Sequence, residues 1–180
     1  LFLGMTILLS IGYYRYIHKD RVELTLPIDK PMTEGSLKIV AASDLHLGYG
    51  IGKKEFVSWV ELINKENPDI VLIAGDITDN NVHPLYEANM GEVFSRIKTK
   101  YGGYVIPGNH EYIAGESKAE EFLRSACVTF LKDSVALVDD RFYVIGRDDR
   151  SNPERKTIEQ LTASIDRTKP TILLDHQPYH

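Results

Sequence analysis

Three stretches of the chain repeat apolar residues at the spacing of one helix face, and they predict amphipathic helices. Residues at i, i+3, i+4 and i+7 lie on the same side of an α-helix, so each stretch should pack one side against a sheet. The apolar positions are Phe56, Trp59, Val60 and Ile63 in the first stretch, Met90, Val93, Phe94 and Ile97 in the second, and Ala119, Phe122, Leu123 and Ala126 in the third.

Two local signals predict where helices begin. Ser117 followed by Glu120 has the spacing of a capping box and should start the third helix. Asn152-Pro153 offers an N-cap and a first-turn proline, and it should start a fourth helix that extends to about residue 165.

Short apolar runs between the helices predict strands. They cover residues 37–42, 70–74, 104–106 and 171–174, and residues 135–138 and 142–145 form a hairpin around Asp139-Asp140-Arg141. Residues 22–26 alternate apolar and polar side chains and predict an edge strand, followed by a turn region through residue 35. The fold class expected is α/β, with layered mixed β-sheets flanked by helices.

The beginning of the chain has a different character. Residues 1–14 carry no charge, three tyrosines occur at positions 13, 14 and 16, and Arg15, Lys19 and Arg21 follow. A bilayer core needs about 20 apolar residues, so we interpret residues 1–19 as the end of a transmembrane helix with its basic flank. A signal-peptide core and a buried helix are the alternatives, but neither bases before the apolar run nor a cleavage site after it are seen.

Residues 20–180 are expected to form one catalytic domain, because no linker or repeat divides them. The basic flank places this domain in the cytoplasm and predicts association with the cell membrane. Twenty-six acidic residues against 21 basic ones give a formal net charge of −5, which disfavours nucleic acid as a partner. The single cysteine, Cys127, lies in an apolar stretch and is expected to be buried.

Polar clusters follow four of the predicted strands. The clusters are residues 43–48, 75–79, 108–111 and 175–178. Loops at the carboxyl ends of neighbouring strands share one crevice in α/β sheets, so these clusters should converge. Their Asp, His and Asn side chains suit divalent transition-metal ions, and a carboxylate such as Asp76 can bridge two of them.

Each cluster taken alone has a plainer interpretation. Asp44-Leu45-His46 and Gly75-Asp76 are common in turns, and a single His176 is more often structural than a ligand. Gly-Asn-His-Glu at residues 108–111 is more specific, because packing does not explain four such residues at the end of an apolar run. The ordered set, with each cluster after its own strand, favours a metal site.

These motifs resemble the calcineurin-like metallophosphoesterases, and in particular their membrane-associated bacterial branch. The resemblance begins at about Leu37. The family pattern is D-x-H, G-D-x-x-D, G-N-H-[DE], a single His and G-H-x-H, and its first four parts correspond to Asp44 and His46, Asp76, Asn109 and His110, and His176. G-H-x-H is absent and His180 does not replace it by motif, so we expect a chain truncated at its C-terminus whose last metal ligands lie outside it.

The resemblance implies a layered α/β sandwich and a centre of two divalent metal ions, drawn from Mn, Fe and Zn. It implies that Asp44 and His46 hold one ion, that Asn109 and His176 hold the other, and that Asp76 bridges them. It further implies that the ions activate a hydroxide and that His110 is the catalytic residue, which donates a hydrogen bond or proton towards the phosphate or its leaving group.

Other residues near the motifs have open roles. Glu111, Asp79 and Asp175 either orient imidazoles or are solvated loop carboxylates. Arg147, in a Gly-Arg-Asp-Asp turn, either binds a phosphate or belongs to an exposed, self-neutralising turn, which we favour. We leave His83 outside the site because an isolated histidine before a proline is common in loops that start helices.

Two functions from different classes follow from this sequence. The first is a membrane-tethered phosphoesterase that hydrolyses phosphomonoesters or phosphodiesters, including those of lipids or the cell envelope. The second is a non-catalytic relative that serves as a binding or scaffold domain at the membrane. The motif residues favour the enzyme, because a degenerate copy should lose ligands before it loses its fold.

Overall fold

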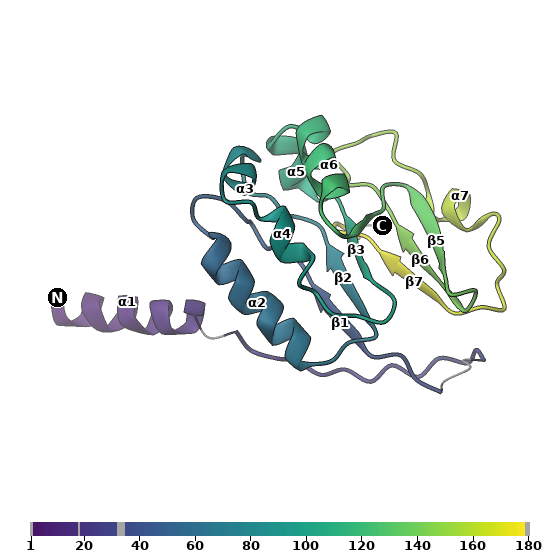
Figure 1. Cartoon of the computed structure of the whole chain (residues 1–180), viewed down its shortest axis with the longest axis horizontal. Coiled ribbons are helices and arrows are strands. Elements are labelled where there is room, and N and C mark those ends of the chain that lie inside the picture. The colour runs from purple at the N-terminus through teal and green to yellow at the C-terminus, as the bar shows by residue number, and fades with distance from the viewer. Residues whose placement is uncertain (1, 18, 32–34, 179–180) are drawn as a thin grey trace.

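The computed structural model describes residues 2–17, 19–31 and 35–178, which form two packed β-sheets and their helices (Figure 1). The helices are α1 (Phe2–Ile17), α2 (Lys53–Lys65), α3 (His83–Glu87), α4 (Gly91–Phe94), α5 (Asn109–Ile113), α6 (Glu116–Ser125) and α7 (Ile158–Thr162). The strands are β1 (Ile39–Ala42), β2 (Ile70–Ala74), β3 (Gly103–Ile106), β4 (Thr129–Phe130), β5 (Ser134–Val138), β6 (Phe142–Gly146) and β7 (Thr171–Leu174).

The first sheet is parallel, and its strand β2 is buried on both faces. Its strand order is β1-β2-β3-β4, and β2 lies between β1 and β3. Val71 and Ile73 of β2 pack into a core with residues of α2, α4 and α6, whereas Ile70 and Leu72 belong to a second core. Successive side chains of a strand point to opposite faces, which is why one continuous apolar run supplies both cores.

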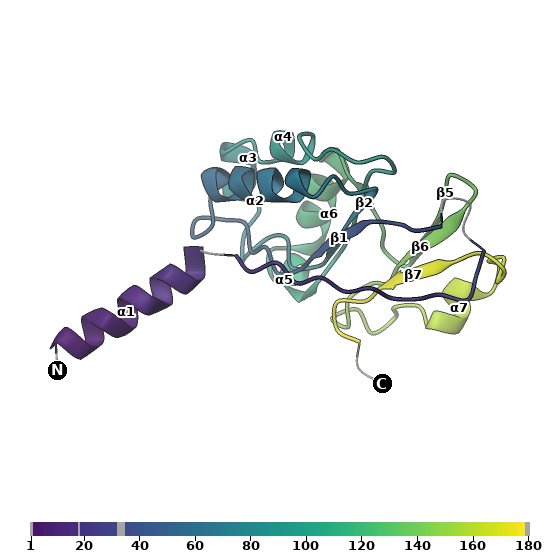
Figure 2. The same ribbon diagram turned by 90° about the horizontal axis from the view of Figure 1, so that it is seen from below.

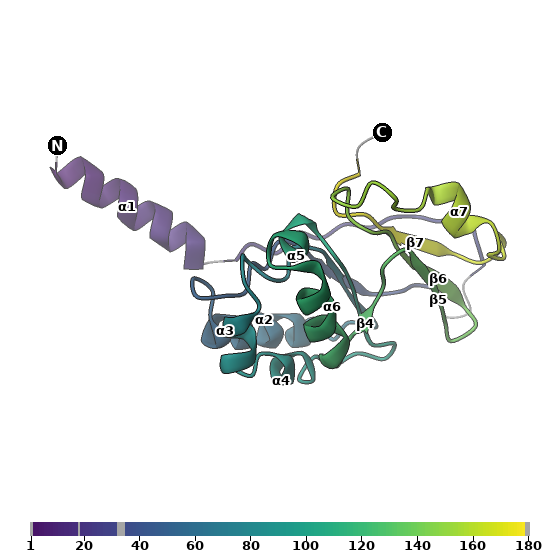
Figure 3. The same cartoon turned by 90° about the horizontal axis from the view of Figure 1, so that it is seen from above.

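The second sheet covers the other face of the first. It has the order β5-β6-β7, with an antiparallel β5–β6 hairpin and a parallel β6–β7 pair. Phe142, Val144 and Leu174 of this sheet pack against Leu72 and Ile106 of the first. Figures 2 and 3 show α2, α3 and α4 on one side of the molecule and α7 beside the second sheet. The predicted α/β fold with layered mixed sheets and flanking helices is confirmed.

Two predicted elements do not form as expected. Residues 22–26 are not a strand, and Val22, Leu24 and Leu26 are exposed, because no strand among the described residues pairs with them. Of the turn region predicted after them, residues 32–34 lie outside the described residues. The predicted helix over 90–97 is shortened to α4, and a separate short helix, α3, comes before it, with Asn89 at a φ of +49° between the two.

The helix starts are also corrected. Helix α6 begins after Gly115, whose φ of +98° favours glycine, so Ser117 lies inside the helix. Helix α7 begins after Thr157, whose side chain forms a capping box with that of Gln160, and not at Asn152-Pro153, where an N-cap and a first-turn proline were expected. Cys127 is exposed and not buried, because its neighbour Ala126 takes the inward position at the end of α6.

Helix α1 projects away from the two sheets (Figure 1). Its apolar side chains are exposed, and it joins the body where the Tyr16 hydroxyl donates a hydrogen bond to Glu55 at 2.8 Å and Lys19 lies over the Trp59 ring. Across the described ranges, no helix combines the length and the apolar character needed to cross a bilayer. Leu1 and His18 lie outside the described residues.

Candidate metal centre

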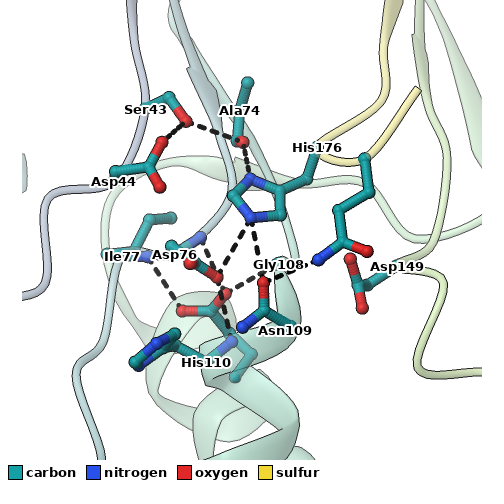
Figure 4. Close-up of polar contacts among 12 residues, drawn as sticks. Ser43, Asp44, Ala74, Asp76, Ile77, Gly108, Asn109, His110, Asp149 and His176 are labelled. Atoms are coloured by element: carbon teal, nitrogen blue, oxygen red, sulfur yellow. Dashed lines mark hydrogen bonds and ion pairs between the residues drawn. The ribbon is translucent and has the colours of Figure 1, made fainter. Parts of the chain in front are cut away.

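The predicted site residues meet at the carboxyl ends of β1, β2, β3 and β7, and Figure 4 shows all of them except His46. Asp44 and His46 follow β1, Asp76 follows β2, and Asn109 opens α5 after β3. His176 reaches the same place from β7, so the site joins the two sheets. Parallel strands end at one edge, which is why residues far apart in the sequence converge here.

The loops after β1 and β2 are held against each other by their own backbones. The Asp44 N–H donates to the Gly75 carbonyl at 3.1 Å, and the His46 N–H donates to the Asp76 carbonyl at 3.0 Å. Asp44, His46 and Asp76 have φ values of 57°, 44° and 51°, in the left-handed region. This unusual backbone turns their side chains towards the common centre, as Figure 4 shows for Asp44 and Asp76.

His176 lies in a tight space between the two sheets. Its Nδ1 is 2.7 Å from the Ala74 carbonyl and so donates its proton there, which leaves Nε2 facing Asp76 Oδ1 at 3.3 Å. A Cβ atom at Gly75 would lie 2.8 Å from the imidazole ring, and one at Gly108 would lie 2.9 Å from it. The two glycines therefore make room for the imidazole, and the carbonyl sets its tautomer.

Asp76 is the shared centre of the site, and its side chain is 5% exposed. Burial would raise the pKa of Asp76, but hydrogen bonds from His176 and from the His110 backbone N–H outweigh it and hold the pKa below its usual value. The same contact with Asp76 is the main cause that raises the pKa of His176 to about 9. The pair thus carries a carboxylate and an imidazolium at neutral pH.

Two groups of potential ligand atoms share Asp76. One contains His46, Asp76 and His110, the other contains Asp44, Asp76 and His176, and the atoms within each group lie within 4.8 Å of one another. Carboxylate and imidazole donors clustered in this way suit divalent transition metals, so the residues present fit a metal centre. The family resemblance implied that Asp44 shares an ion with His46, whereas this grouping places Asp44 with His176. Asp44 Oδ1 nevertheless lies 3.9 Å from His46 Nε2.

Asn109 presents its amide oxygen to the same centre. Asn109 Oδ1 is 3.3 Å from His176 Nε2 and accepts a hydrogen bond from Gln177 Nε2 at 2.8 Å. Gln177 therefore orients this amide, a role that the sequence analysis missed. Its position directly after a predicted ligand was the only signal available.

His110 belongs to the group of His46 and Asp76 and lies in the first turn of α5. Its Nδ1 lies 3.2 Å from the Asp79 carbonyl oxygen and 3.6 Å from Asp79 Oδ1. Its ring meets that of His46 edge to face, with centroids 4.4 Å apart. Asp79 thus contacts the imidazole of His110, one of the two roles considered for it, and leaves the other ring nitrogen for a further partner.

Glu111 has neither of the roles considered for it, because it contacts backbone groups and is buried. Its carboxylate accepts hydrogen bonds from the N–H groups of Asp76, Ile77, Thr78 and Gly108 at 2.7–3.1 Å, and from the Thr78 hydroxyl at 3.0 Å. Burial raises the pKa of Glu111, while the bonds from Thr78 and Gly108 oppose this effect. Glu111 joins the loops after β2 and β3.

The turn at residues 146–149 is not the exposed turn that was favoured. Asp148 and Asp149 are fully buried. Arg147 donates a hydrogen bond to Asp175 at 2.9 Å, so neither residue is solvated and Asp175 contacts arginine instead of an imidazole. His83 is exposed and pairs with Glu87 at 3.3 Å, outside the site as expected.

Comparisons with known proteins identify the relatives of this chain. A family model described as calcineurin-like phosphoesterase matches residues 37–180. A "transmembrane protein with metallophosphoesterase domain" from Danio rerio is 31% identical over 172 residues, covering 88% of this chain and 39% of that protein. An uncharacterized metallophosphoesterase from Helicobacter pylori strain J99 is 30% identical, covering 93% and 45%.

Other comparisons extend to a thermophile and to a solved structure. An uncharacterized metallophosphoesterase from Aquifex aeolicus is 28% identical and covers 97% of this chain and 69% of that protein. The crystal structure of a 5'-nucleotidase precursor from Thermus thermophilus is similar with a TM-score of 0.51 and 14% identity, over 77% of this chain and 36% of that one. This likeness supports the fold. The chain spans less than half the length of the Danio rerio and Helicobacter pylori relatives.

Proposed function

This chain belongs to the calcineurin-like phosphoesterase family, and on that premise we propose that it hydrolyses phosphomonoesters or phosphodiesters at a centre of two divalent metal ions. Family membership supports a metal-dependent hydrolase. The observation that supports two ions is the pair of ligand groups with Asp76 in common. One carboxylate between two donor groups is the arrangement that a bridged pair of ions requires.

The five proposed ligands are Asp44, His46, Asp76, Asn109 and His176. When bound, two such ions supply Lewis acidity that lowers the pKa of water and offsets phosphate charge. The protein prepares this site before any ion enters, since Ala74 fixes the tautomer of His176 and Gln177 turns the oxygen of Asn109 inward. Manganese, iron and zinc all accept this mixture of carboxylate, amide and imidazole donors.

His110 is proposed as the catalytic residue. Asp79 holds its Nδ1 as a donor, so Nε2 is the nitrogen that carries a proton to or from the phosphate or leaving group. His110 also lies within the group of His46 and Asp76. A ligand role for His110 is the competing interpretation, and retention of metal by a His110→Ala variant separates the two roles.

We also propose that α1 attaches the protein to a membrane, with the catalytic domain in the cytoplasm. The exposed apolar surface of α1 and the basic residues after it support this proposal, as does the name of the Danio rerio relative. A lipid or cell-envelope phosphoester is then the substrate class that the attachment favours. A scaffold without catalysis is the second candidate, but no observation in the described site favours it.

The decisive experiment measures metal and hydrolysis together. The protein is loaded with Mn²⁺, Fe²⁺ or Zn²⁺, its metal content is measured, and hydrolysis of p-nitrophenyl phosphate and bis-p-nitrophenyl phosphate is followed before and after chelation. We expect two ions per chain and hydrolysis that chelation abolishes and metal restores. Full activity in metal-free protein would refute the proposal, and two bound ions without hydrolysis of any ester would favour the scaffold.

A further inference from the structure

The 146–149 turn is a buried, charged segment to which the proposed reaction assigns no role. It leaves β6 where β3 and β7 end, since Gly146 pairs with Leu174 of β7. A Cβ atom at Gly146 would lie 2.8 Å from the Ile106 side chain of β3, so the backbone passes directly against both strands. Ile106 precedes Asn109 by three residues, and Leu174 precedes His176 by two.

One contact of the turn reaches α5, the helix that begins with Asn109. The Tyr112 hydroxyl lies 2.8 and 2.9 Å from the two carboxylate oxygens of Asp148. Asp148 is held in turn by Asn152 Nδ2 and by the Asp149 N–H, each at 2.8 Å. Burial is the largest cause that raises the pKa of Tyr112, and the hydrogen bond to Asp148 raises it further. The Tyr112 hydroxyl therefore stays a donor.

A second contact reaches the segment that carries His176. Arg147 donates to Asp175 Oδ2 at 2.9 Å, and Arg155 lies 3.4 Å from Asp175 Oδ1. The three side chains are 15%, 11% and 6% exposed, so solvent screens this network weakly. Asp175 is thereby fixed on both of its oxygens directly before the proposed ligand.

We infer that the 146–149 turn, with Arg155, positions the half of the metal centre formed by Asn109 and His176. This inference rests on the proposed metal-dependent function. The turn holds the two peptides that carry these side chains, one through Tyr112 and one through Asp175. Asp44 and His46 are held by carbonyls of the loop after β2 instead, so the turn acts on one half of the site only.

Asp149 gives an electrostatic argument for the same inference. Its Oδ1 accepts a hydrogen bond from the Ser151 N–H at 2.8 Å, whereas its buried Oδ2 has no hydrogen-bond partner among the described residues. Figure 4 shows Asp149 on the side of Asn109. A buried carboxylate that is only partly hydrogen-bonded favours a positive charge nearby, which is what an ion at this half of the site provides.

The test follows each half of the site separately. Zn²⁺ is titrated into the chain labelled with ¹⁵N-histidine, and the ring signals of His46 and His176 report the two halves by NMR. The variants are Tyr112→Phe, which removes one hydroxyl, and Arg147→Gln, which leaves Arg155 on Asp175. The matched controls are Tyr143→Phe, whose hydroxyl contacts the Asp166 N–H, and Arg96→Gln, which breaks a surface ion pair with Glu92.

We expect the midpoint of the His176 response to rise by about 10–100-fold in Zn²⁺ concentration in both variants, as is typical when support of a metal ligand is lost. The His46 midpoint should stay within about twofold, and the controls should move neither. Equal rises of the His46 and His176 midpoints would mean that the variants loosen the whole site, and this would overturn the inference. Unchanged midpoints in both variants would overturn it as well. Tyr112→Phe keeps the test decisive should Arg147→Gln fail to fold.

The same titration separates this inference from the proposed function. A wild-type chain in which neither ring responds to Zn²⁺ would refute the metal-dependent function and the inference with it. A wild-type chain that binds at both rings, with variants that behave like the controls, would refute the positioning role alone.

Discussion

Replacing Glu111 with Gln should destabilise the protein strongly although the two side chains have the same shape. The Glu111 carboxylate accepts hydrogen bonds from four backbone N–H groups and one hydroxyl, all of them buried. An amide has one oxygen and one NH₂ group, so it can accept on one side only. Its NH₂ group would face N–H donors that have no other acceptor among the described residues.

The magnitude follows from counting the donors on each oxygen. Oε2 accepts from the Asp76 and Gly108 N–H groups, and Oε1 accepts from the N–H groups of Ile77 and Thr78 and from the Thr78 hydroxyl. The less harmful orientation of the amide therefore leaves two buried N–H groups without acceptors. Each costs about 1–3 kcal/mol, so we expect a loss of about 2–6 kcal/mol in the free energy of unfolding.

Urea unfolding followed by circular dichroism measures this loss. Glu121→Gln makes the same chemical change at an exposed position of α6 and should stay within about 0.5 kcal/mol of the wild type. A loss below about 1 kcal/mol for Glu111→Gln would refute the reasoning. It would mean that water or a shifted backbone replaces the carboxylate at little cost.

Three further predictions concern the metal centre. His110→Ala should keep both ions, measured by elemental analysis, but lower kcat by about 10²–10⁴, and an unchanged kcat would exclude the proposed proton transfer. Gly108→Ala should reduce metal binding and the melting temperature, because its Cβ would lie 2.5 Å from the Asp76 backbone nitrogen, whereas Gly50→Ala, with open space around it, should change neither. The pKa of His176 is raised to about 9, so its proton competes with metal below that pH, and affinity measured by titration at pH 6.5, 7.5 and 8.5 should rise by up to about tenfold per unit. An affinity that stays flat over this range would contradict the third prediction.

Strands and their polar ends could be predicted because both depend on local sequence. The strand over 70–74 has the predicted bounds, since a short apolar run followed by Gly-Asp has few alternatives to a buried strand. The convergence of Asp44 with Asp76 then follows from the parallel pairing of β1 and β2, whereas His176 reaches them from the second sheet. Residues 22–26 show the limit, because an alternating pattern does not tell whether another strand pairs with it.

The supporting contacts of the site could not be predicted in the same way. Glu111 follows His110 in the sequence, but its partners are backbone N–H groups, which have no signature in a list of side chains. Tyr112 and Asp148 are 36 positions apart, and their contact depends on how closely the two sheets pack at Gly146. Tertiary packing therefore decides these roles.

The left-handed backbone at Asp44, His46 and Asp76 turns the proposed ligands towards the site but destabilises the folded protein. A non-glycine residue in this conformation costs up to about 1–2 kcal/mol, and aspartate and asparagine bear less of that cost than histidine does. Selection for thermal stability alone would favour glycine at these positions and would remove the proposed ligands. An inactive protein that keeps the native loops is better made with asparagine than with alanine, because asparagine tolerates the same backbone.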